Sequence, residues 1–379
     1  MKMNEDCIRY TESTEQEALD LLAELAKIPA PSWHEEKRAE FCKAWLEKQG
    51  AKGVYIDEAL NVIYPIGVTE DNPIVVFVAH SDVVFPDTEE LPLKVEDGRM
   101  YCPGIGDDTA DVVAMLYAAK YVTEKKLIPK ELGVLLVVNT GEEGLGNLHG
   151  CRQIMKDFGA RTKEFFTFDA SNGHIADTCV GSKRFSIEIT TEGGHSFGRF
   201  GNRNAIYYLS KLITDLYAVK VPEGGKTTFN VGIIKGGTSV NTIAQQAEML
   251  YEFRSDRREN LAYMQEHLDA ALAFYRTKGI GVKCELIGDR PCMGDVNPDD
   301  QKRLADQAGD LVRRYFDCEP EYSPGSTDCN IPLSMGIPAV SVGCYFGAGA
   351  HTRGEYVEID SLIKGRKLAL DLILQYFQD

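Results

Sequence analysis

Residues 74–82 read Ile-Val-Val-Phe-Val-Ala-His-Ser-Asp, and this stretch decides the fold class. The run over 74–79 is apolar throughout, which is short for a helix and typical of a buried strand in an α/β sheet. His80 and Asp82 follow where the strand ends. Taken alone, such a pair is usually a core histidine beside a solvated aspartate. A histidine and a carboxylate that leave a buried strand together can also hold a metal. The other polar residues of the chain must therefore decide between these two interpretations.

Further acidic residues and a histidine also stand at the ends of apolar segments. Solvated acids scatter over polar helix faces, whereas these recur where strands end in glycine-rich loops, which is where open α/β sheets build their sites. We therefore interpret them, together with the residues at the end of the first strand, as one constellation. They are the pairs Asp107-Asp108 and Glu142-Glu143, followed by Asp169 and His351.

The composition is that of a soluble globular protein. The 379 residues are 44% hydrophobic and 26% charged, and the chain is long enough for two domains. The net charge of -17 argues against nucleic acid or an anionic membrane as partner, because phosphate binding needs a basic face. The 10 cysteines form no Cys-x-x-Cys pair, so we expect reduced thiols in a cytoplasmic protein. The first residues lack the apolar region of a signal peptide, and no apolar run approaches the length of a bilayer span, so we expect neither secretion through a cleaved signal nor a membrane-spanning segment.

Alternating strands and helices predict an α/β domain with an insertion. Capping boxes at Ser13 with Gln16, and at Ser32 with Glu35, predict where the first two helices begin. Helical spacing of apolar residues predicts a further helix over 111–124.

The pattern changes near Gly181, where a β-α-β-β-α-β unit typical of a separate α+β domain begins. The α/β pattern then resumes with a helix over 298–316 and a strand over 339–342. The first domain is therefore expected to be discontinuous in sequence. The predicted domains are residues 1–181 with 291–379, and residues 182–290.

The constellation matches what a pair of divalent metals requires. Two metals roughly 3.5–4 Å apart need a bridging carboxylate and further ligands for each. Asp107 would bridge, His80 and Asp169 would complete one metal, and Glu143 with His351 would complete the other. Each metal would keep an open position, as a catalytic zinc does, whereas a structural zinc would be closed by cysteines. We expect two zinc ions per subunit, with cobalt or manganese as possible substitutes.

Two acids remain for catalysis. Asp82, on the same strand face as His80, can accept the second imidazole N–H and fix the tautomer. Glu142 can take a proton from a metal-bound water and pass it to a leaving amine. An adjacent glutamate pair is usually a solvated helix start, but a preceding apolar strand makes that interpretation weaker. A local hydrogen-bonding role is expected for Asp108 and a helix-start charge for Asp111.

The insertion and the C-terminal part contain weaker candidates. Arg254 and Asn241 together suit a substrate carboxylate, although a surface ion pair explains Arg254 equally well. His195 stands between a glycine pair and a serine and could be a turn histidine. Gly325 and Ser326 open a Gly-Ser-Thr-Asp stretch that could face a substrate or cap a helix.

Over essentially its whole length, the chain resembles the aminoacylase/carboxypeptidase family of co-catalytic zinc hydrolases. The resemblance rests on the ordered motifs HSD, GIGDD, NTGEEG, FDA, GGHSFG, GGTSVN, GSTD and AHTRGE. It implies a zinc-peptidase-type α/β catalytic domain and a smaller inserted lid domain that often mediates dimerisation, so a homodimer is a possible state. It implies metal-ligand roles for His80, Asp107, Glu143, Asp169 and His351, and catalytic roles for Asp82 and Glu142.

The resemblance also implies substrate contacts and a reaction. The residue matching His195 reaches an active site, sometimes that of the partner subunit, to polarise the scissile carbonyl, and those matching Asn241 and Arg254 hold substrate. An aspartate at position 169 favours the peptidase T-like branch over carboxypeptidases and deacylases. We therefore expect hydrolysis of amide bonds in small peptides by a di-/tripeptidase or aminopeptidase.

Alternative functions remain open. An N-acyl-amino-acid amidohydrolase or a carboxypeptidase would use the same chemistry on a different amide. A non-catalytic binding homologue would usually have lost metal ligands or the general base, and here all are present. A cysteine hydrolase lacks a local signature.

Overall fold

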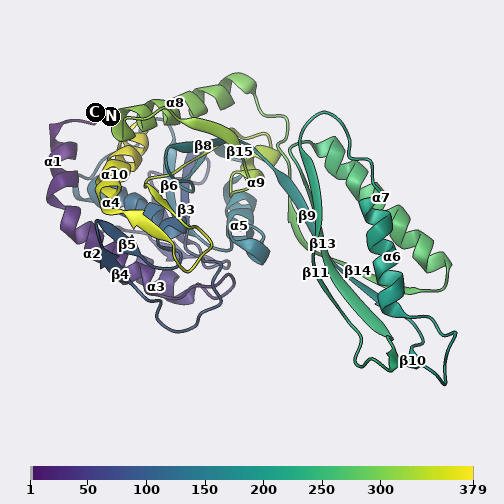
Figure 1. Ribbon diagram of the computed structural model, residues 1–379. Helices are drawn as coiled ribbons and strands as arrows, with labels where there is room; N and C mark the ends of the chain where they lie inside the picture. Colours follow the sequence, from purple (N-terminus) through teal and green to yellow (C-terminus); the bar gives the residue numbers. More distant parts are fainter. Residues whose placement is uncertain (1–2, 379) are drawn as a thin grey trace. The chain divides into compact units, whose positions relative to one another are not determined.

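The computed structural model describes residues 3–378 and divides them into two compact units. The first unit runs to Cys179 and resumes at Gly294, and the second spans Val180–Met293. Figure 1 shows the strands and helices of each. An α/β unit interrupted by a smaller α+β unit is the predicted fold class, which is thereby confirmed.

The first unit is built on an eight-stranded sheet of order β1-β2-β6-β3-β7-β16-β8-β15. Its central strands β6, β3, β7 and β16 run parallel, and every residue of β3 and β6 is buried. Burial on both faces explains their continuous valine, leucine and phenylalanine content. The strands are β1 (Tyr55–Ile56), β2 (Val62–Ile66), β3 (Ile74–His80), β6 (Gly133–Asn139), β7 (Thr162–Thr167), β8 (His174–Cys179), β15 (Glu321–Gly325) and β16 (Ala339–Val342).

The register of the parallel strands brings their ends to one edge of the sheet. His80 at the end of β3 is paired with Asn139 at the end of β6. The loops after β3, β6 and β7 therefore leave the sheet together, at the carboxyl edge where α/β proteins form their sites.

Helices and a small second sheet complete this unit. Helix α4 packs against α10 and β3 and is buried along almost its whole length. Each buried valine, leucine or methionine side chain of such a helix contributes about 1.5–3 kcal/mol relative to exposure. The helices are α1 (Glu5–Ser13), α2 (Glu15–Ala26), α3 (Glu36–Lys48), α4 (Asp111–Glu124), α5 (His149–Phe158), α8 (Pro298–Phe316), α9 (Asn330–Ser334) and α10 (Ile359–Leu374), and the small sheet contains β4 (Lys94–Glu96), β5 (Arg99–Tyr101), β17 (Gly347–Ala348) and β18 (Tyr356–Glu358).

Both predicted capping boxes are wrong. Ser13 is the last residue of α1, and its hydroxyl donates to the Tyr10 carbonyl at 3.1 Å. The side chain that caps α1 is Asn4, which accepts a hydrogen bond from the Cys7 N–H. Helix α3 begins only at Glu36, because the side chains expected to cap it are engaged elsewhere.

The second unit is an antiparallel sheet of order β11-β13-β9-β14 with two helices. Alternate residues of β9 and β13 are buried and form a core with α6 and α7. Asn204 caps α6 by accepting from the N–H groups of Ile206 and Tyr207. The elements are β9 (Gly181–Thr190), β10 (Gly194–His195), α6 (Ala205–Tyr217), β11 (Thr227–Gly236), β12 (Thr242–Ile243), β13 (Gln246–Ser255), α7 (Arg258–Thr277) and β14 (Gly281–Arg290).

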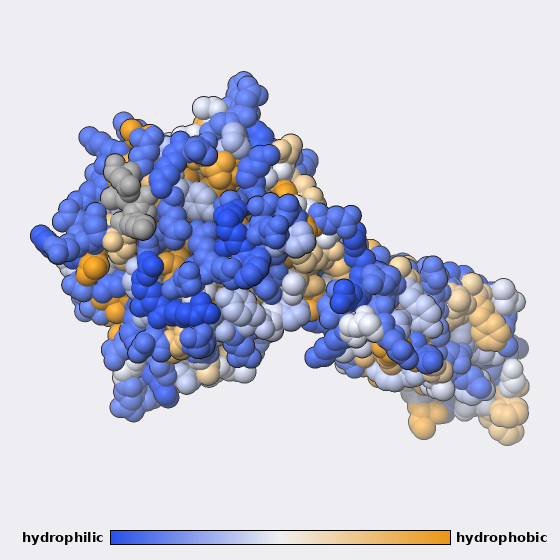
Figure 2. All heavy atoms as spheres, turned by 90° about the horizontal axis from the view of Figure 1, so that it is seen from above, coloured by the Kyte–Doolittle hydropathy of each residue, from blue (hydrophilic) through white to orange (hydrophobic). Residues whose placement is uncertain are grey.

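The surface and the cysteines agree with the composition. Hydrophilic residues cover most of the face seen in Figure 2. All ten cysteines are free thiols. Within residues 3–378, no helix has both the length and the apolar character needed to cross a bilayer.

Candidate active site

His80 is wholly buried at the end of β3, with each ring nitrogen facing a different acid. Its Nδ1 lies 3.1 Å from the carbonyl oxygen of Asp82 and 3.4 Å from the Oδ1 of Asp82. Its Nε2 lies 3.1 Å from the Oδ1 of Asp107. The contacts of Nδ1 orient the ring so that Nε2 is the nitrogen available to a metal.

Asp107 lies between two imidazoles. Its Oδ1 faces His80, and its Oδ2 lies 3.1 Å from the Nε2 of His351. The same nitrogen of His351 lies 3.0 Å from the Oε1 of Glu143. One carboxylate that directs an oxygen to each histidine has the arrangement of a bridging ligand.

Ligand-type atoms cluster in two overlapping groups. The donor atoms of His80, Asp107 and Glu143 lie within 4.8 Å of one another, and so do those of His80, Asp108 and Asp169. Asp108 also accepts a hydrogen bond from the backbone N–H of His80 at 2.8 Å, which is the local role expected for it. The structure therefore brings together all the side chains predicted as metal ligands.

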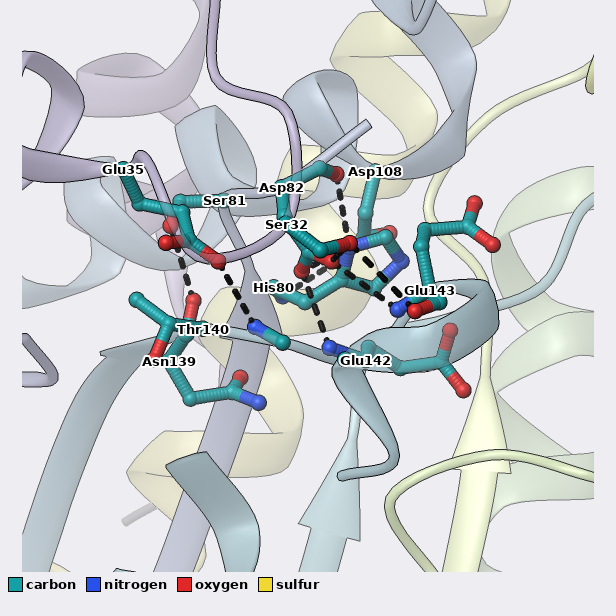
Figure 3. A network of polar contacts seen from close by, with 12 residues as sticks. Ser32, Glu35, His80, Ser81, Asp82, Asp108, Asn139, Thr140, Glu142 and Glu143 are labelled. Atoms are coloured by element: carbon teal, nitrogen blue, oxygen red, sulfur yellow. Dashed lines mark hydrogen bonds and ion pairs between the residues drawn. The ribbon is translucent and has the colours of Figure 1, made fainter. Parts of the chain in front are cut away.

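Asp82 organises the loop that follows β6. Its Oδ1 accepts the N–H of Glu142 at 3.0 Å, and its Oδ2 accepts the N–H of Glu143 at 2.9 Å (Figure 3). The hydroxyl of Ser32 donates to the same Oδ2 at 2.7 Å. Burial opposes ionisation of Asp82, but the bonds from His80, Ser32 and Glu143 outweigh it and lower the pKa of Asp82. The sequence predicts only the contact with His80.

The electrostatics of the cluster suit a cation. Burial, followed by the charges of Asp107 and Glu142, raises the pKa of Glu143 to about 7 although His351 opposes the shift. Burial and Glu142 hold the pKa of Asp169 well above its usual value. Hydrogen bonds to Asp107 and Glu143 raise the pKa of His351 to about 10. Carboxylates and imidazoles that pull protons into a buried site fit divalent metals, which replace those protons.

Several supporting residues were not found from the sequence. Glu355 is buried and accepts hydrogen bonds from the N–H groups of Gly104, Gly106 and Asp107, each at 2.8 Å. It therefore fixes the backbone of the bridging aspartate. Its only sequence signal is its place at the end of the motif that begins near His351.

Asp111 and Asp328 have structural partners of their own. Asp111 starts α4 as predicted, and its Oδ1 accepts the N–H of Cys344 at 2.6 Å. Asp328 is buried, and its Oδ2 accepts a hydrogen bond from the amide of Asn139 at 2.6 Å. Burial and the charge of Glu142 raise the pKa of Asp328 to about 7.

The remaining predicted residues have local contacts that leave their alternatives open. His195 is exposed in the second unit, and its Nδ1 accepts the N–H groups of Phe197 and Gly198 at 3.2 Å. Arg254 donates to Glu252 on the same strand, and the Oδ1 of Asn241 accepts from a neighbouring serine. These contacts fit a turn histidine and an ion pair, while the substrate roles stay predictions.

Gly325 and Ser326 lead from β15 into α9. The turn after them is closed by Thr327, whose N–H donates to the Oδ1 of Asn330 at 2.9 Å. Gly325 itself is the last residue of β15. The turn interpretation therefore describes their local geometry, and contact with a substrate stays a prediction.

Comparison with known proteins places the chain in a family. The sequence profile described as peptidase family M20/M25/M40 matches residues 76–375. The chain belongs to this family. The resemblance seen in the sequence is thereby confirmed, and the protein is a hydrolase of the M20 peptidase and amidohydrolase class.

Individual proteins match along nearly the whole chain. A succinyl-diaminopimelate desuccinylase of Corynebacterium glutamicum is 26% identical over 368 residues, covering 91% of this chain and 94% of the relative. The structure of a tripeptidase from Staphylococcus aureus superposes with a TM-score of 0.74 at 23% identity, covering 95% of this chain and 98% of that one. Bacillus subtilis YXEP, a dinuclear metal-binding peptidase of the family, superposes with a TM-score of 0.65 at 18% identity, covering 96% and 99%. The two structural likenesses show the fold.

Proposed function

We propose that this M20 hydrolase cleaves amide bonds in small peptides, as a di-/tripeptidase or aminopeptidase, with two zinc ions per subunit. The observation that carries the proposal is the position of Asp107, with one oxygen toward His80 and the other toward His351. Asp82 contacts His80, and Glu143 contacts His351. A single bridging acid between two histidines is what a two-metal site needs.

The proposed ligand sets share that aspartate. His80 and Asp169 would complete one metal, while Glu143 and His351 would complete the other, with Asp107 common to both. Cobalt or manganese could replace zinc, because nitrogen and oxygen donors bind several first-row metals. When bound, the metals would acidify a water molecule and polarise the scissile carbonyl.

Glu142 is the proposed general base and acid. Its backbone is fixed by Asp82, and its side chain is almost wholly buried beside Glu143. The Glu142 carboxylate would take a proton from the attacking water as the water oxygen bonds to the carbonyl carbon. As the C–N bond breaks, Glu142 would return that proton to the leaving amine. Asp82 would hold both His80 and the loop in place during these steps.

Substrate contacts are proposed from the remaining predicted residues. His195 would polarise the carbonyl, and Asn241 with Arg254 would hold a substrate carboxylate. Gly325 and Ser326 would offer N–H and hydroxyl donors. These assignments rest on the family resemblance and on donor chemistry.

A deacylase of N-acyl amino acids is the second candidate function. The desuccinylase relative, whose name describes removal of an acyl group, favours it. The aspartate at position 169 favours a peptidase instead, because it fits the peptidase T-like branch of the family better than the deacylases. A carboxypeptidase would instead need recognition of the free carboxylate end.

The deciding experiment is a substrate panel. Purified protein, with and without chelator and added Zn²⁺, is assayed on di- and tripeptides, N-acyl amino acids and carboxypeptidase substrates. Zinc-restored cleavage of free-amine peptides supports the peptidase, and preference for N-acylated substrates supports the deacylase. Two bound metals without turnover on any of them would contradict the proposed function and favour a binding homologue.

A homodimer through the second unit is also proposed. Strand β11 is an edge of its sheet and exposes Ile233 and Ile234, by 46% and 54%. Ile206 and Tyr207 of the adjoining helix α6 are 42% and 53% exposed. An edge strand with exposed apolar side chains is a ready pairing surface. Ile234→Lys should convert a dimer to a monomer in sedimentation velocity, and an unchanged mass would contradict this interface.

A further inference from the structure

The segment of residues 32–35 lies directly against the loop 140–146 that carries Glu142 and Glu143. The sequence predicts Ser32 and Glu35 as a helix cap, but α3 begins only after them. The hydroxyl of Ser32 instead donates to Asp82 at 2.7 Å and lies 3.3 Å from the carbonyl oxygen of Glu143. Ser32 therefore touches both the loop and the acid that holds it.

Glu35 makes the next contact. Its side chain is wholly buried, and its Oε1 accepts the N–H of Gly141 at 3.1 Å. Its Oε2 has no hydrogen-bond partner within residues 3–378. A buried carboxylate with so few partners costs free energy, so folding stability does not explain why a glutamate stands at this position. Its hydrogen bond to the 140–146 loop explains it.

Trp33 covers the other end of the loop. Its indole N–H donates to the carbonyl of Leu145 at 3.2 Å, and its ring stacks on His149 at 4.1 Å with planes 7° apart. The His149 ring in turn lies 3.2 Å from the hydroxyl of Thr140 and 3.3 Å from the carbonyl of Gly146. His149 thus connects the two ends of the loop, and Trp33 lies over it.

Two further observations show that this arrangement is specific. Trp33 has a φ of 75°, a left-handed conformation that favours glycine, and its side chain is nonetheless 56% exposed. A Cβ added to Gly141 would lie 1.8 Å from the Nδ1 of His149, so only glycine lets the loop pass this close to that ring. Local backbone strain of this kind clusters at functional sites.

We propose that residues 32–35 form a positioning clamp for the 140–146 loop. Through Asp82, Gly141 and His149, this clamp sets where the carboxylates of Glu142 and Glu143 lie. The inference deepens the proposed function, and rests on it for the role of Glu142. Ser32, Trp33 and Glu35 act through other residues and touch no reacting atom.

The first test measures catalysis in the metal-loaded full chain. Ser32→Ala should lower kcat by about 10- to 100-fold, because small misplacements of a catalytic group have effects of that size. KM, zinc content and melting temperature should stay at wild-type values. Ser32→Thr, which keeps the hydroxyl, should restore most of the rate. The matched control is Ser13→Ala, which removes a hydroxyl-to-carbonyl bond on α1.

The second test needs no activity. Amide hydrogen exchange by mass spectrometry should rise in the peptide that contains Gly141 in Glu35→Ala, and return in Glu35→Gln, which keeps an acceptor oxygen. Trp33→Gly suits the local backbone, so the protein should stay folded while exchange in the 140–146 loop rises. Trp33→Phe should retain part of the protection through stacking.

The outcomes separate this clamp from the proposed reaction. Ser32→Ala with wild-type kcat, or with a loss matched by loss of zinc or of melting temperature, would overturn the clamp. Wild-type exchange in both Glu35→Ala and Trp33→Gly would overturn it as well. A wild-type protein that cleaves none of the panel substrates would overturn the reaction alone, since the exchange measurements still decide the clamp.

Discussion

The two units present polar side chains in opposite ways. His80 and Asp82 of the first unit are wholly buried, and each has several partners at hydrogen-bond distance. His195 and Asn241 of the second unit are exposed, and the side-chain hydrogen bonds of both join neighbours within three residues. Buried polar groups are costly without partners, so the first cluster has one defined geometry, whereas exposed groups can adapt to a ligand. We expect metal chemistry to depend on the first cluster and substrate affinity on the second.

Metal removal tests the first cluster most severely. Exhaustive chelation should abolish amide hydrolysis and lower the melting temperature, because the metals bind the folded state and offset the repulsion between Asp107, Glu143 and Asp169. Differential scanning calorimetry and rate measurements before and after zinc is restored check both effects. Full activity in metal-free protein would contradict a metal-dependent mechanism.

Replacement of the proposed base separates catalysis from metal binding. Glu142→Gln keeps the size of the side chain and removes its proton-accepting oxygen, so kcat should fall by about a hundredfold to ten-thousandfold. Zinc content, measured by atomic emission, should remain at the wild-type value. If Glu142→Gln turns over at the wild-type rate, Glu142 is not the general base.

Changes in the second unit should show the contrasting pattern. Arg254→Ala should raise KM by about 10- to 100-fold for a substrate with a free carboxylate, since one charge-assisted contact is worth about 1.5–3 kcal/mol. Zinc content and kcat should change little, and folding stability by about 0.5 kcal/mol at most, because Arg254 is a partly exposed residue. An unchanged KM would favour the simple ion pair with Glu252.

Proton release on metal binding is the smallest expected effect. The pKa of His351 is raised from 6.5 to about 10, so in metal-free protein this imidazole is protonated near neutral pH. A ligand histidine must be neutral, so metal binding should release about one proton from this residue. Calorimetry in buffers of different ionisation enthalpy measures the total release, to which Glu143 and Asp169 also contribute, and zero release at pH 7.5 would exclude His351 as a ligand.

The raised pKa of His351 also makes the stability of the metal-free protein depend on pH. A histidine whose pKa is raised on folding stabilises the fold fully below its unfolded pKa, near 6.5, and loses that contribution as the pH rises through about 10. Chelated protein should therefore lose this contribution between those values, whereas His351→Ala in the same buffer should not. Urea melts across that pH window compare the two.

Elements with strong local signals were predicted well. The helix over Pro298–Phe316, the strand over Ala339–Val342 and the helix that starts at Asp111 have the predicted bounds or nearly so, because proline, apolar spacing and short apolar runs act locally. The two capping boxes failed because a serine or glutamate side chain near a helix start can bond elsewhere. Ser32 is the clear case, since its partner Asp82 stands fifty residues further along the chain.

In the candidate site, too, features with a local sequence signal were predicted and contacts between distant segments were not. Its acids and histidines were recognisable because each follows an apolar strand and precedes a glycine-rich loop. The bridging position of Asp107 was predicted as well. The support from Glu355 and Glu35 was not recognisable, because each of these bonds joins segments far apart in sequence.

The sequence by itself therefore determined the α/β architecture, the insertion and the set of polar residues at strand ends, since all of these follow from local hydrophobic pattern and composition. Only the tertiary structure decided that Glu355 fixes the backbone of the bridging aspartate, and that residues 32–35 contact the loop of Glu142 instead of capping a helix. The physical reason is that hydrogen bonds between buried groups depend on distance and direction in space. Parallel strand register and loop packing set those distances, and neither is visible in the order of residues along one segment.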